Sequence, residues 1–221
     1  MAGEAQTKDR SRGTWHVVLA LASAQFIMVL DSTVMNVSIE KVIKDLDTTV
    51  TEMQLAIATY TLTMASLMLV GGKIGDIIGR RRAFRIGLIM FGCGAAITAA
   101  SPSIGVLMAG WSITEALGAV LMVPAVAALI TSNYEGQQRA IAFGVIGGVA
   151  GAAAAAGPIV GGWVSTAFSW RVVFAAEVVI VVGLLLASRM IRDAPREGER
   201  PKLDVVGALL SAGGLALIVL A

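Results

Sequence analysis

The sequence predicts an all-α polytopic membrane protein. Of its 221 residues, 57% are hydrophobic and only 14% are charged, and the mean hydropathy is +0.81. A soluble domain of this size has too small an interior to bury so much apolar surface. The charged residues lie in short segments, separated by apolar runs close to the roughly 20 residues that a helix needs to cross a bilayer. A membrane β-barrel would instead alternate apolar and polar residues.

Six apolar spans follow a polar, cytoplasmic N-terminal tail at residues 1–13, which we expect to be disordered or to lie on the membrane surface. The first span runs from Trp15 to about Val37. It is longer than the hydrophobic region of a signal peptide and contains Asp31, so we interpret it as a retained span. The other five are expected at about residues 52–71, 83–101, 104–131, 140–165 and 171–190.

These spans define a six-helix transmembrane bundle over residues 14–191. Residues 192–203, rich in Pro, Glu and Arg, are expected to form a cytoplasmic linker, and residues 204–221 a truncated seventh helix. Opposite orientation of the two helix triplets would suit a 3+3 inverted repeat. A seventh helix that is cut off predicts a partner, a C-terminal bundle in the same longer chain or in a second polypeptide.

The basic residues predict the orientation. With a cytoplasmic N-terminus, only Lys41, Lys44 and Arg171 lie outside. Such an asymmetry is typical of a multi-pass protein of the cell (inner or plasma) membrane. The basic residues placed inside are Lys8, Arg10, Arg12, Lys73, Arg80, Arg81, Arg82, Arg85, Arg139, Arg189, Arg192, Arg196, Arg200 and Lys202.

Several function classes are disfavoured. The single Cys93 and the single His16 exclude an intrachain disulfide and a Cys/His metal site, so neither a metal nor a cofactor is expected. A net charge of +2 is too small to suggest nucleic acid as a partner. Residues 71–82 lack the G-K-[ST] ending of a P-loop, so ATP drive is not supported. We find no nucleophile–base pair and therefore no enzyme.

The segment between spans two and three combines glycines with an acid and several bases. The glycines permit a sharp bend, and Asp76 can accept hydrogen bonds from helix-terminal amides or from the neighbouring arginines. We interpret the segment as a conformational latch that holds cytoplasmic helix ends together in one state and releases them in the other. The latch residues are Gly72, Asp76, Gly79, Arg80 and Arg81.

Asp31, Glu115 and Glu177 are the only acids placed within spans. An intramembrane carboxylate is costly, so it faces the bundle interior, forms a pair or carries a proton. Each of the three could bind a proton or a cationic substrate, and exchange between the two would produce antiport. The alternative is a neutral, hydrogen-bonded acid or one near an interface, and it applies most readily to Glu177.

Other polar residues suggest a central cavity. Gln25, Ser32 and Asn36 repeat at helical spacing in span one beside Asp31, and Trp111 precedes Glu115 by one turn. We assign these residues, with the three acids, to proton or substrate binding. The stripe of Thr59, Thr63 and Ser66 in span two is interpreted instead as contact between helices.

Span five carries small residues at helical spacing and one proline. Small residues let helices approach closely, and Pro158 removes a hydrogen bond and bends the helix. Tight packing alone explains the glycines, and control of rocking between two bundles is compatible with it. The residues assigned to this helix are Gly148, Gly157, Pro158, Gly161 and Gly162.

Taken together, these segments resemble motifs of one family. Residues 72–82 resemble the G-x-L-x-D-x-x-G-R-[KR]-[KR] loop of the major facilitator superfamily, and residues 157–162 its G-P-x-x-G-G antiporter motif. Residues 30–37 are similar to the L-D-x-T-I-V-N-V signature of the fourteen-spanner drug:proton antiporters. Residues 169–174 and 203–207 resemble the starts of their sixth and seventh helices.

The resemblance implies a secondary active transporter, here the N-terminal half, that exports lipophilic or cationic drugs in exchange for protons by alternating access (multidrug efflux). Two departures stand out. Ser112 occupies the place of the arginine usual in helix four, and Glu177 that of an asparagine in helix six. The alternatives are a metabolite or lipid transporter of the same fold, or a non-autonomous half. The expected partners are the lipid bilayer, protons, a small-molecule substrate and the C-terminal bundle.

Overall fold

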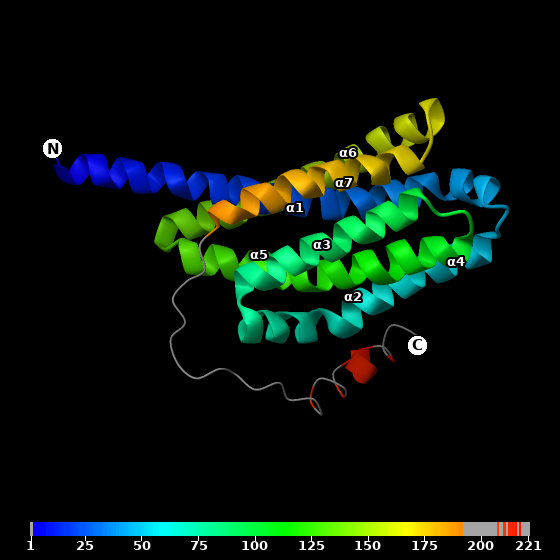
Figure 1. Ribbon diagram of the computed structural model, residues 1–221, viewed down its shortest axis with the longest axis horizontal. Helices are drawn as coiled ribbons and strands as arrows, with labels where there is room; N and C mark the ends of the chain where they lie inside the picture. Colours follow the sequence, from blue (N-terminus) through cyan, green and yellow to red (C-terminus); the bar gives the residue numbers. More distant parts are fainter. Residues whose placement is uncertain (1, 192–206, 208–209, 211, 216, 218–221) are drawn as a thin grey trace.

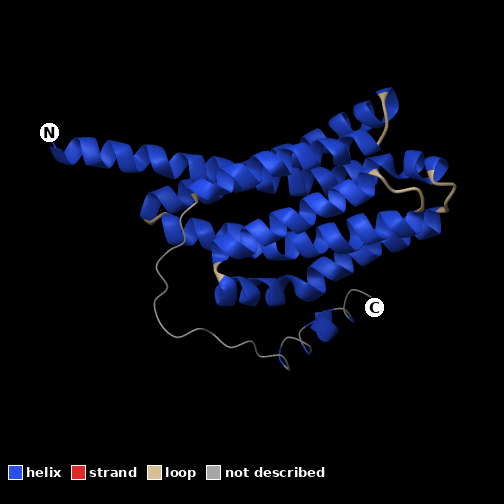
Figure 2. Ribbon diagram, in the orientation of Figure 1, coloured by secondary structure: helices blue, strands red, loops and turns tan. Residues whose placement is uncertain are grey.

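The computed structural model describes residues 2–191, 207, 210, 212–215 and 217 of the chain, and those residues include no strand (Figures 1 and 2). Six helical stretches in this part are long and apolar enough to cross a membrane, as the sequence predicts. The elements are α1 (Ala2–Asp45), α2 (Val50–Ile78), α3 (Arg80–Ala99), α4 (Ile104–Leu107), the π-helical segment η1 (Met108–Glu115), α5 (Ala116–Asn133), α6 (Gly136–Ala167), α7 (Arg171–Ala187) and the 3-10 turn η2 (Ser188–Met190).

Helices α1 and α2 extend further than expected. Helix α1 begins at Ala2, so residues 2–13, expected to be disordered or surface-bound, are helical and continuous with the first span. Helix α2 continues to Ile78 and takes in most of the segment expected to be a loop. The linker expected at residues 192–203 lies outside the described residues. Residues 207, 210, 212–215 and 217, within the expected seventh helix, are helical.

The turns alternate between two ends of the bundle (Figure 1). One end, here called the Asp45 end, carries the α1–α2, α3–α4 and α6–α7 connections, and the other, the Gly79 end, carries the α2–α3 and α5–α6 connections. At the Asp45 end, Thr49 and Glu52 form a capping box that starts α2, since each side chain accepts a hydrogen bond from the backbone of the other. Short connections of this kind force consecutive helices to run antiparallel.

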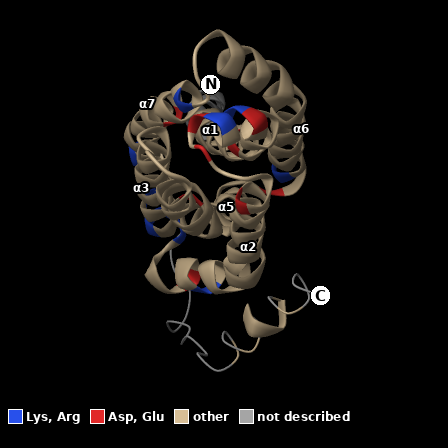
Figure 3. Cartoon of the chain, turned by 90° about the vertical axis from the view of Figure 1, so that its right-hand side faces the viewer, with Lys and Arg blue, Asp and Glu red and all other residues tan. Residues whose placement is uncertain are grey.

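Seen along the helices, α3 and α7 lie on one side, α2 and α6 on the other, with α1 and α5 between them (Figure 3). Helices α1 and α6 pack closely. The space between them is so small that a Cβ added to Gly157 would lie 1.9 Å from Thr33 Oγ1. The Ser38 and Ser165 hydroxyls share a buried 2.8 Å hydrogen bond across the same contact. Only a glycine at position 157 permits this approach.

Two large hydrophobic clusters and a smaller one, formed by Leu30, Val34, Ala153 and Val173, fill the interior of the described residues. The Gly79-end cluster includes Leu21, Phe84, Leu88, Phe91, Met122, Leu129 and Val181. The Asp45-end cluster includes Met35, Val42, Met53, Leu107, Trp111, Trp170 and Phe174. Both draw on helices from the two ends of the sequence, so the six spans form one packed unit.

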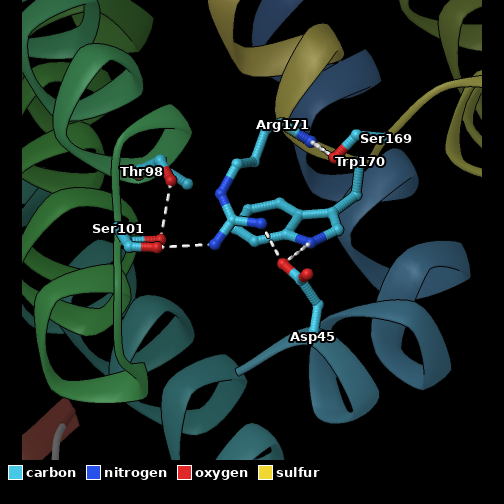
Figure 4. A network of polar contacts seen from close by, with 6 residues as sticks. All are labelled: Asp45, Thr98, Ser101, Ser169, Trp170 and Arg171. Carbon is cyan, nitrogen blue, oxygen red and sulfur yellow. Dashed lines mark hydrogen bonds and ion pairs between the residues drawn. The ribbon is translucent and has the colours of Figure 1, made fainter. Parts of the chain in front are cut away.

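A polar network closes the Asp45 end (Figure 4). Arg171, at the start of α7, forms an ion pair with Asp45 at the end of α1 and donates a 2.7 Å hydrogen bond to the Ser101 carbonyl between α3 and α4. Its guanidinium lies 4.4 Å from the centre of the Trp170 ring, and the Trp170 indole donates to Asp45. One arginine therefore joins three helix ends.

We predict that Arg171→Gln lowers the stability of the purified chain by about 1–3 kcal/mol, because it leaves the buried Ser101 carbonyl without its donor. The exposed ion pair with Asp45 adds little to that figure. Thermal unfolding in detergent measures the change, and Lys41→Gln, an exposed charge on the same end of α1, is the matched control. Equal melting temperatures for both variants would contradict the role given to Arg171.

Candidate functional site

The three intramembrane acids converge in the middle of the bundle. Asp31 lies on α1, Glu115 ends η1, and Glu177 lies on α7, and their exposed fractions are 0%, 0% and 1%. One carboxylate oxygen from each lies within 4.8 Å of the others. Glu177 is thus buried and part of the group. We call these residues the acid cluster.

Helical spacing explains why the acid cluster lies where it does. Each acid is one turn from a member of the Gly79-end cluster on one side and of the Asp45-end cluster on the other. The three acids therefore occupy a polar layer between two apolar ones. The flanking pairs are Met28 and Met35 for Asp31, Ala119 and Trp111 for Glu115, and Val181 and Phe174 for Glu177.

Two neutral donors hold the acid cluster. The Trp111 indole N–H lies 3.1 Å and 3.0 Å from the two oxygens of Asp31, and Tyr60 stacks on the Trp111 ring at 4.6 Å. The Thr98 hydroxyl donates to Glu115 Oε1 at 2.8 Å. Glu115 Oε2 and both oxygens of Glu177 have no hydrogen-bond partner among the described residues. Much of the negative charge, if present, would be uncompensated.

The π-helical segment sets the direction of Trp111 and Glu115. Such segments are rare and occur frequently at functional sites. Within it Ser112, which replaces the arginine usual in the resembling family, is buried and donates a 2.8 Å hydrogen bond to the Ala56 carbonyl of α2. No cationic side chain is thus supplied from this position, and the segment is tied to α2 instead.

The remaining polar residues assigned to binding are not brought to the acid cluster by any recorded contact. Ser32 donates to the Val29 carbonyl, and the exposed Asn36 donates to the Ser32 carbonyl, both within α1. Gln25 is half-buried. In α2, Thr59, Thr63 and Ser66 likewise donate to carbonyls four residues earlier, so their hydroxyls do not join helices as expected.

The latch segment is mostly helical, with a single turn residue. Gly72 and Asp76 belong to α2, and Gly79 alone links α2 to α3. Its backbone has φ 106° and ψ 134°, a conformation that residues other than glycine rarely adopt. The Asp76 Oδ1 atom lies 3.7 Å from Nε of Arg80 in α3. The expectation that residues 72–82 form a loop was wrong, because α2 continues to Ile78 and α3 begins at Arg80. Glycines are tolerated in helices that pack closely, as Gly71 is against Val120.

The two latch arginines reach other helices. Arg80 donates a 3.2 Å hydrogen bond to the Ala128 carbonyl of α5, and Arg81 donates a 3.0 Å bond to the Arg189 carbonyl of η2. Together with the Asp76 contact, these bonds join α2, α3, α5 and η2 at the Gly79 end. The geometry is compatible with a latch, which stays a prediction.

The glycines of α6 fall into two groups. Gly157 and Gly161 pack against Thr33 and Val34 of α1, whereas a Cβ at Gly148 would meet nothing within 4 Å. Gly162 has one ordinary contact, with Val37. Helix α6 continues through Pro158 to Ala167.

Some parts of the site were not apparent from the sequence. Thr98, Asp45 and Ser101 carry no signal that distinguishes them from ordinary residues at helix ends, because their partners lie 17 to 126 positions away. The stacking of Tyr60 on Trp111 likewise has no sequence signal, because the two rings lie on different spans. The alternating direction of the helices could have predicted that Asp45 and Arg171 lie at the same end of the bundle. It could not have predicted that they contact each other.

Comparison with known proteins agrees with the fold. The family model described as the Major Facilitator Superfamily matches residues 21–220. The puromycin resistance protein pur8 of Streptomyces alboniger is 36% identical over 95% of this chain and 42% of its own length. For the probable actinorhodin transporter of Streptomyces coelicolor, the identity is 34%, and the coverage is 93% and 36%. The crystal structure of tetrameric PepTSo2 has a TM-score of 0.70 at 16% identity, covering 95% of this chain and 49% of that one. The chain therefore spans less than half the length of these curated relatives.

We predict that Gly94→Ala disrupts the acid cluster, because its Cβ would lie 2.4 Å from Glu115 Cγ and 2.8 Å from the Gly110 carbonyl oxygen. The expected loss of stability is about 1–3 kcal/mol, as for other overpacked sites, and thermal unfolding measures it. Gly105→Ala is the matched control, since nothing lies within 4 Å of a Cβ there. If Gly94→Ala unfolds at the temperature of the control, the close packing described here is incorrect.

Proposed function

Because the chain belongs to the Major Facilitator Superfamily, we propose that it forms part of a secondary active transporter that exports lipophilic, cationic compounds in exchange for protons. The observation that carries this proposal is the convergence of Asp31, Glu115 and Glu177 in the centre of the bundle. The names of the relatives, a puromycin resistance protein and a probable actinorhodin transporter, support export of antibiotic-like compounds.

The chemistry of the acid cluster supports the proposal that it binds protons. Three ionised carboxylates within 4.8 Å of one another would repel strongly in an apolar interior. Their two hydrogen-bond donors, Trp111 and Thr98, are neutral and do not offset that repulsion. At least one acid therefore carries a proton, and a proton that has to be present in one state can be released in another.

The neighbouring rings support the proposal that the substrate is a lipophilic cation. Tyr60 and Trp111 stack with an interplanar angle of 15°, and the Trp111 indole is bonded to Asp31. An aromatic face beside a carboxylate attracts an organic cation through both cation–π and charge interactions. A substrate cation that pairs with the acid cluster displaces a proton, and this competition links the two movements.

Alternating access requires a second bundle, in a longer chain or a second polypeptide. Helices α2 and α6 have largely uncovered faces, and Gly144, Gly147, Gly148 and Gly151 meet nothing within 4 Å. Faces of this kind suit close packing against other helices. We propose that the two bundles rock against each other in the bacterial inner membrane, with the N-terminus in the cytoplasm.

The proposal predicts that Asp31→Asn, Glu115→Gln and Glu177→Gln each lower proton-gradient-dependent efflux at least about tenfold, because intramembrane acids carry the coupled ion. Proteoliposomes containing the complete transporter measure the initial rate. Glu135→Gln, an exposed acid between α5 and α6, should transport normally. Efflux that survives in all three cluster variants would refute proton coupling at this site.

Substrate class is tested by competition in the same proteoliposomes. Lipophilic cations should compete with one another, while neutral metabolites, anions and lipids should not. Competition by a metabolite or a lipid alone would favour the alternative transporter of the same fold.

For the latch, we predict that Asp76→Asn reduces turnover more than substrate affinity, because Asp76 contacts Arg80 far from the acid cluster. Steady-state transport kinetics separate the two parameters. Glu135→Gln again serves as the charge-matched control at the Gly79 end. A large rise in the KM of Asp76→Asn with unchanged turnover would be the opposite result.

A further inference from the structure

The Thr98 hydroxyl lies between two hydrogen-bond acceptors. Its oxygen is 2.9 Å from the Gly94 carbonyl oxygen, one turn earlier in α3, and 2.8 Å from Oε1 of Glu115 on η1. A threonine hydroxyl has one hydrogen to donate and two lone pairs with which it can accept. Thr98 therefore donates fully to only one of the two oxygens at a time. Which of them receives the hydrogen depends on whether Glu115 carries a proton.

Both protonation states of Glu115 can keep this contact. When Glu115 is ionised, Thr98 donates to its Oε1. When Glu115 is protonated, its own O–H donates to the Thr98 oxygen, and Thr98 donates to the Gly94 carbonyl. The two arrangements differ by the rotation of one hydroxyl hydrogen, so the contact between α3 and η1 survives the change without movement of a heavy atom.

Close packing fixes the position of Thr98. The residue is fully buried, and a Cβ added to Gly110 would lie 2.7 Å from its hydroxyl oxygen and 2.8 Å from its backbone nitrogen. The Ser101 hydroxyl donates a 2.8 Å hydrogen bond to the Thr98 carbonyl. The side chain of Thr98 thus has little room to leave Glu115, whereas its hydroxyl hydrogen is free to rotate.

No hydroxyl group contacts the other two acids in the described part of the chain. The Trp111 indole that binds Asp31 can donate but cannot accept. Neither carboxylate oxygen of Glu177 has a hydrogen-bond partner there. Tyr60 of α2, the other titratable side chain near the cluster, stacks on the Trp111 ring. Of the three acids, only Glu115 is therefore paired with a group that can serve both its protonated and its ionised form.

We propose that Thr98 is a positioning residue that lets Glu115 lose and regain a proton while α3 and η1 stay in contact. When the proton leaves Glu115, the Thr98 hydroxyl turns from Gly94 to Glu115, and it turns back when the proton returns. The inference rests on the proposed exchange of protons at the acid cluster, and it assigns the exchanged proton to Glu115.

Infrared spectroscopy of the purified chain, from acidic to neutral pH, tests the proposal. The carboxylic-acid absorption that Glu115→Gln removes belongs to protonated Glu115. We expect Thr98→Val, which keeps the shape of the side chain but removes the hydroxyl, to shift that absorption. Thr98→Ser keeps the hydroxyl and should leave the absorption at its wild-type frequency. Thr131→Val is the matched control, since the exposed Thr131 hydroxyl donates to a carbonyl of its own helix.

Proteoliposomes containing the complete transporter measure the consequence for the reaction. Without the Thr98 hydroxyl, ionised Glu115 loses a hydrogen bond, and a bond to a charged group changes the population of the charged form about tenfold or more. The initial rate of proton-driven efflux should therefore fall about tenfold in Thr98→Val, and Thr98→Ser should restore most of it. Circular dichroism and size-exclusion profiles establish that each variant is folded.

An absorption at the wild-type frequency in folded Thr98→Val overturns the proposal, as does the lack of any absorption that Glu115→Gln removes. A further spectral shift when Thr98→Val is added to Glu115→Gln also overturns it, because the hydroxyl would then act on another group. A rate that Thr98→Ser does not restore has the same meaning.

The proposed function fails by a different result. Efflux that survives in all three acid variants refutes proton coupling, whatever the spectrum of Thr98→Val. Efflux lost in those variants, together with an unaltered spectrum of Thr98→Val, leaves proton coupling standing and removes only the role of Thr98.

Discussion

Three carboxyl groups lie in one apolar interior, and the free energy needed to keep them there constrains the rest of the structure. Two unit charges about 4 Å apart repel by about 4 kcal/mol even at an effective dielectric constant of 20. A hydrogen bond to a charged group returns about 1.5–3 kcal/mol, and Trp111 and Thr98 provide such bonds to only two of the acids. A bundle with this core is stable only when protons or another cation neutralise part of the charge.

The surrounding helices keep the acids together in spite of this repulsion. Glycines at positions 94 and 110 bring α3 against η1, and the two hydrophobic clusters pack on either side of the acid layer. At the Asp45 end, Arg171 joins three helix ends, and the carbonyl that it binds belongs to Ser101, three residues beyond Thr98. Packing from both ends therefore holds the polar layer together with the hydrogen bonds from Trp111 and Thr98.

Composition was sufficient to predict the six spans found in the described part of the chain, because each span has to be long and apolar. The three acids were recognisable for the same reason, since a carboxylate within an apolar run needs an explanation. Their convergence was not predictable from spacing, because it depends on how α1, η1 and α7 rotate and pack. The helical latch segment was not predictable from residue types either. The same holds for Ser32 and Asn36, whose side chains donate to carbonyls of their own helix. Residue types predicted polarity correctly, but the partners of those polar groups depend on contacts distant in sequence.

Infrared spectroscopy of the purified chain at neutral pH tests the central claim most directly, because protonated and ionised carboxyl groups absorb at different frequencies. We expect a carbonyl stretch from a protonated, water-excluded carboxylic acid, which weakens or shifts in Asp31→Asn, Glu115→Gln and Glu177→Gln and is unchanged in Glu135→Gln. Its absence from the wild-type chain would mean that three ionised carboxylates coexist in the bundle, and would contradict this account.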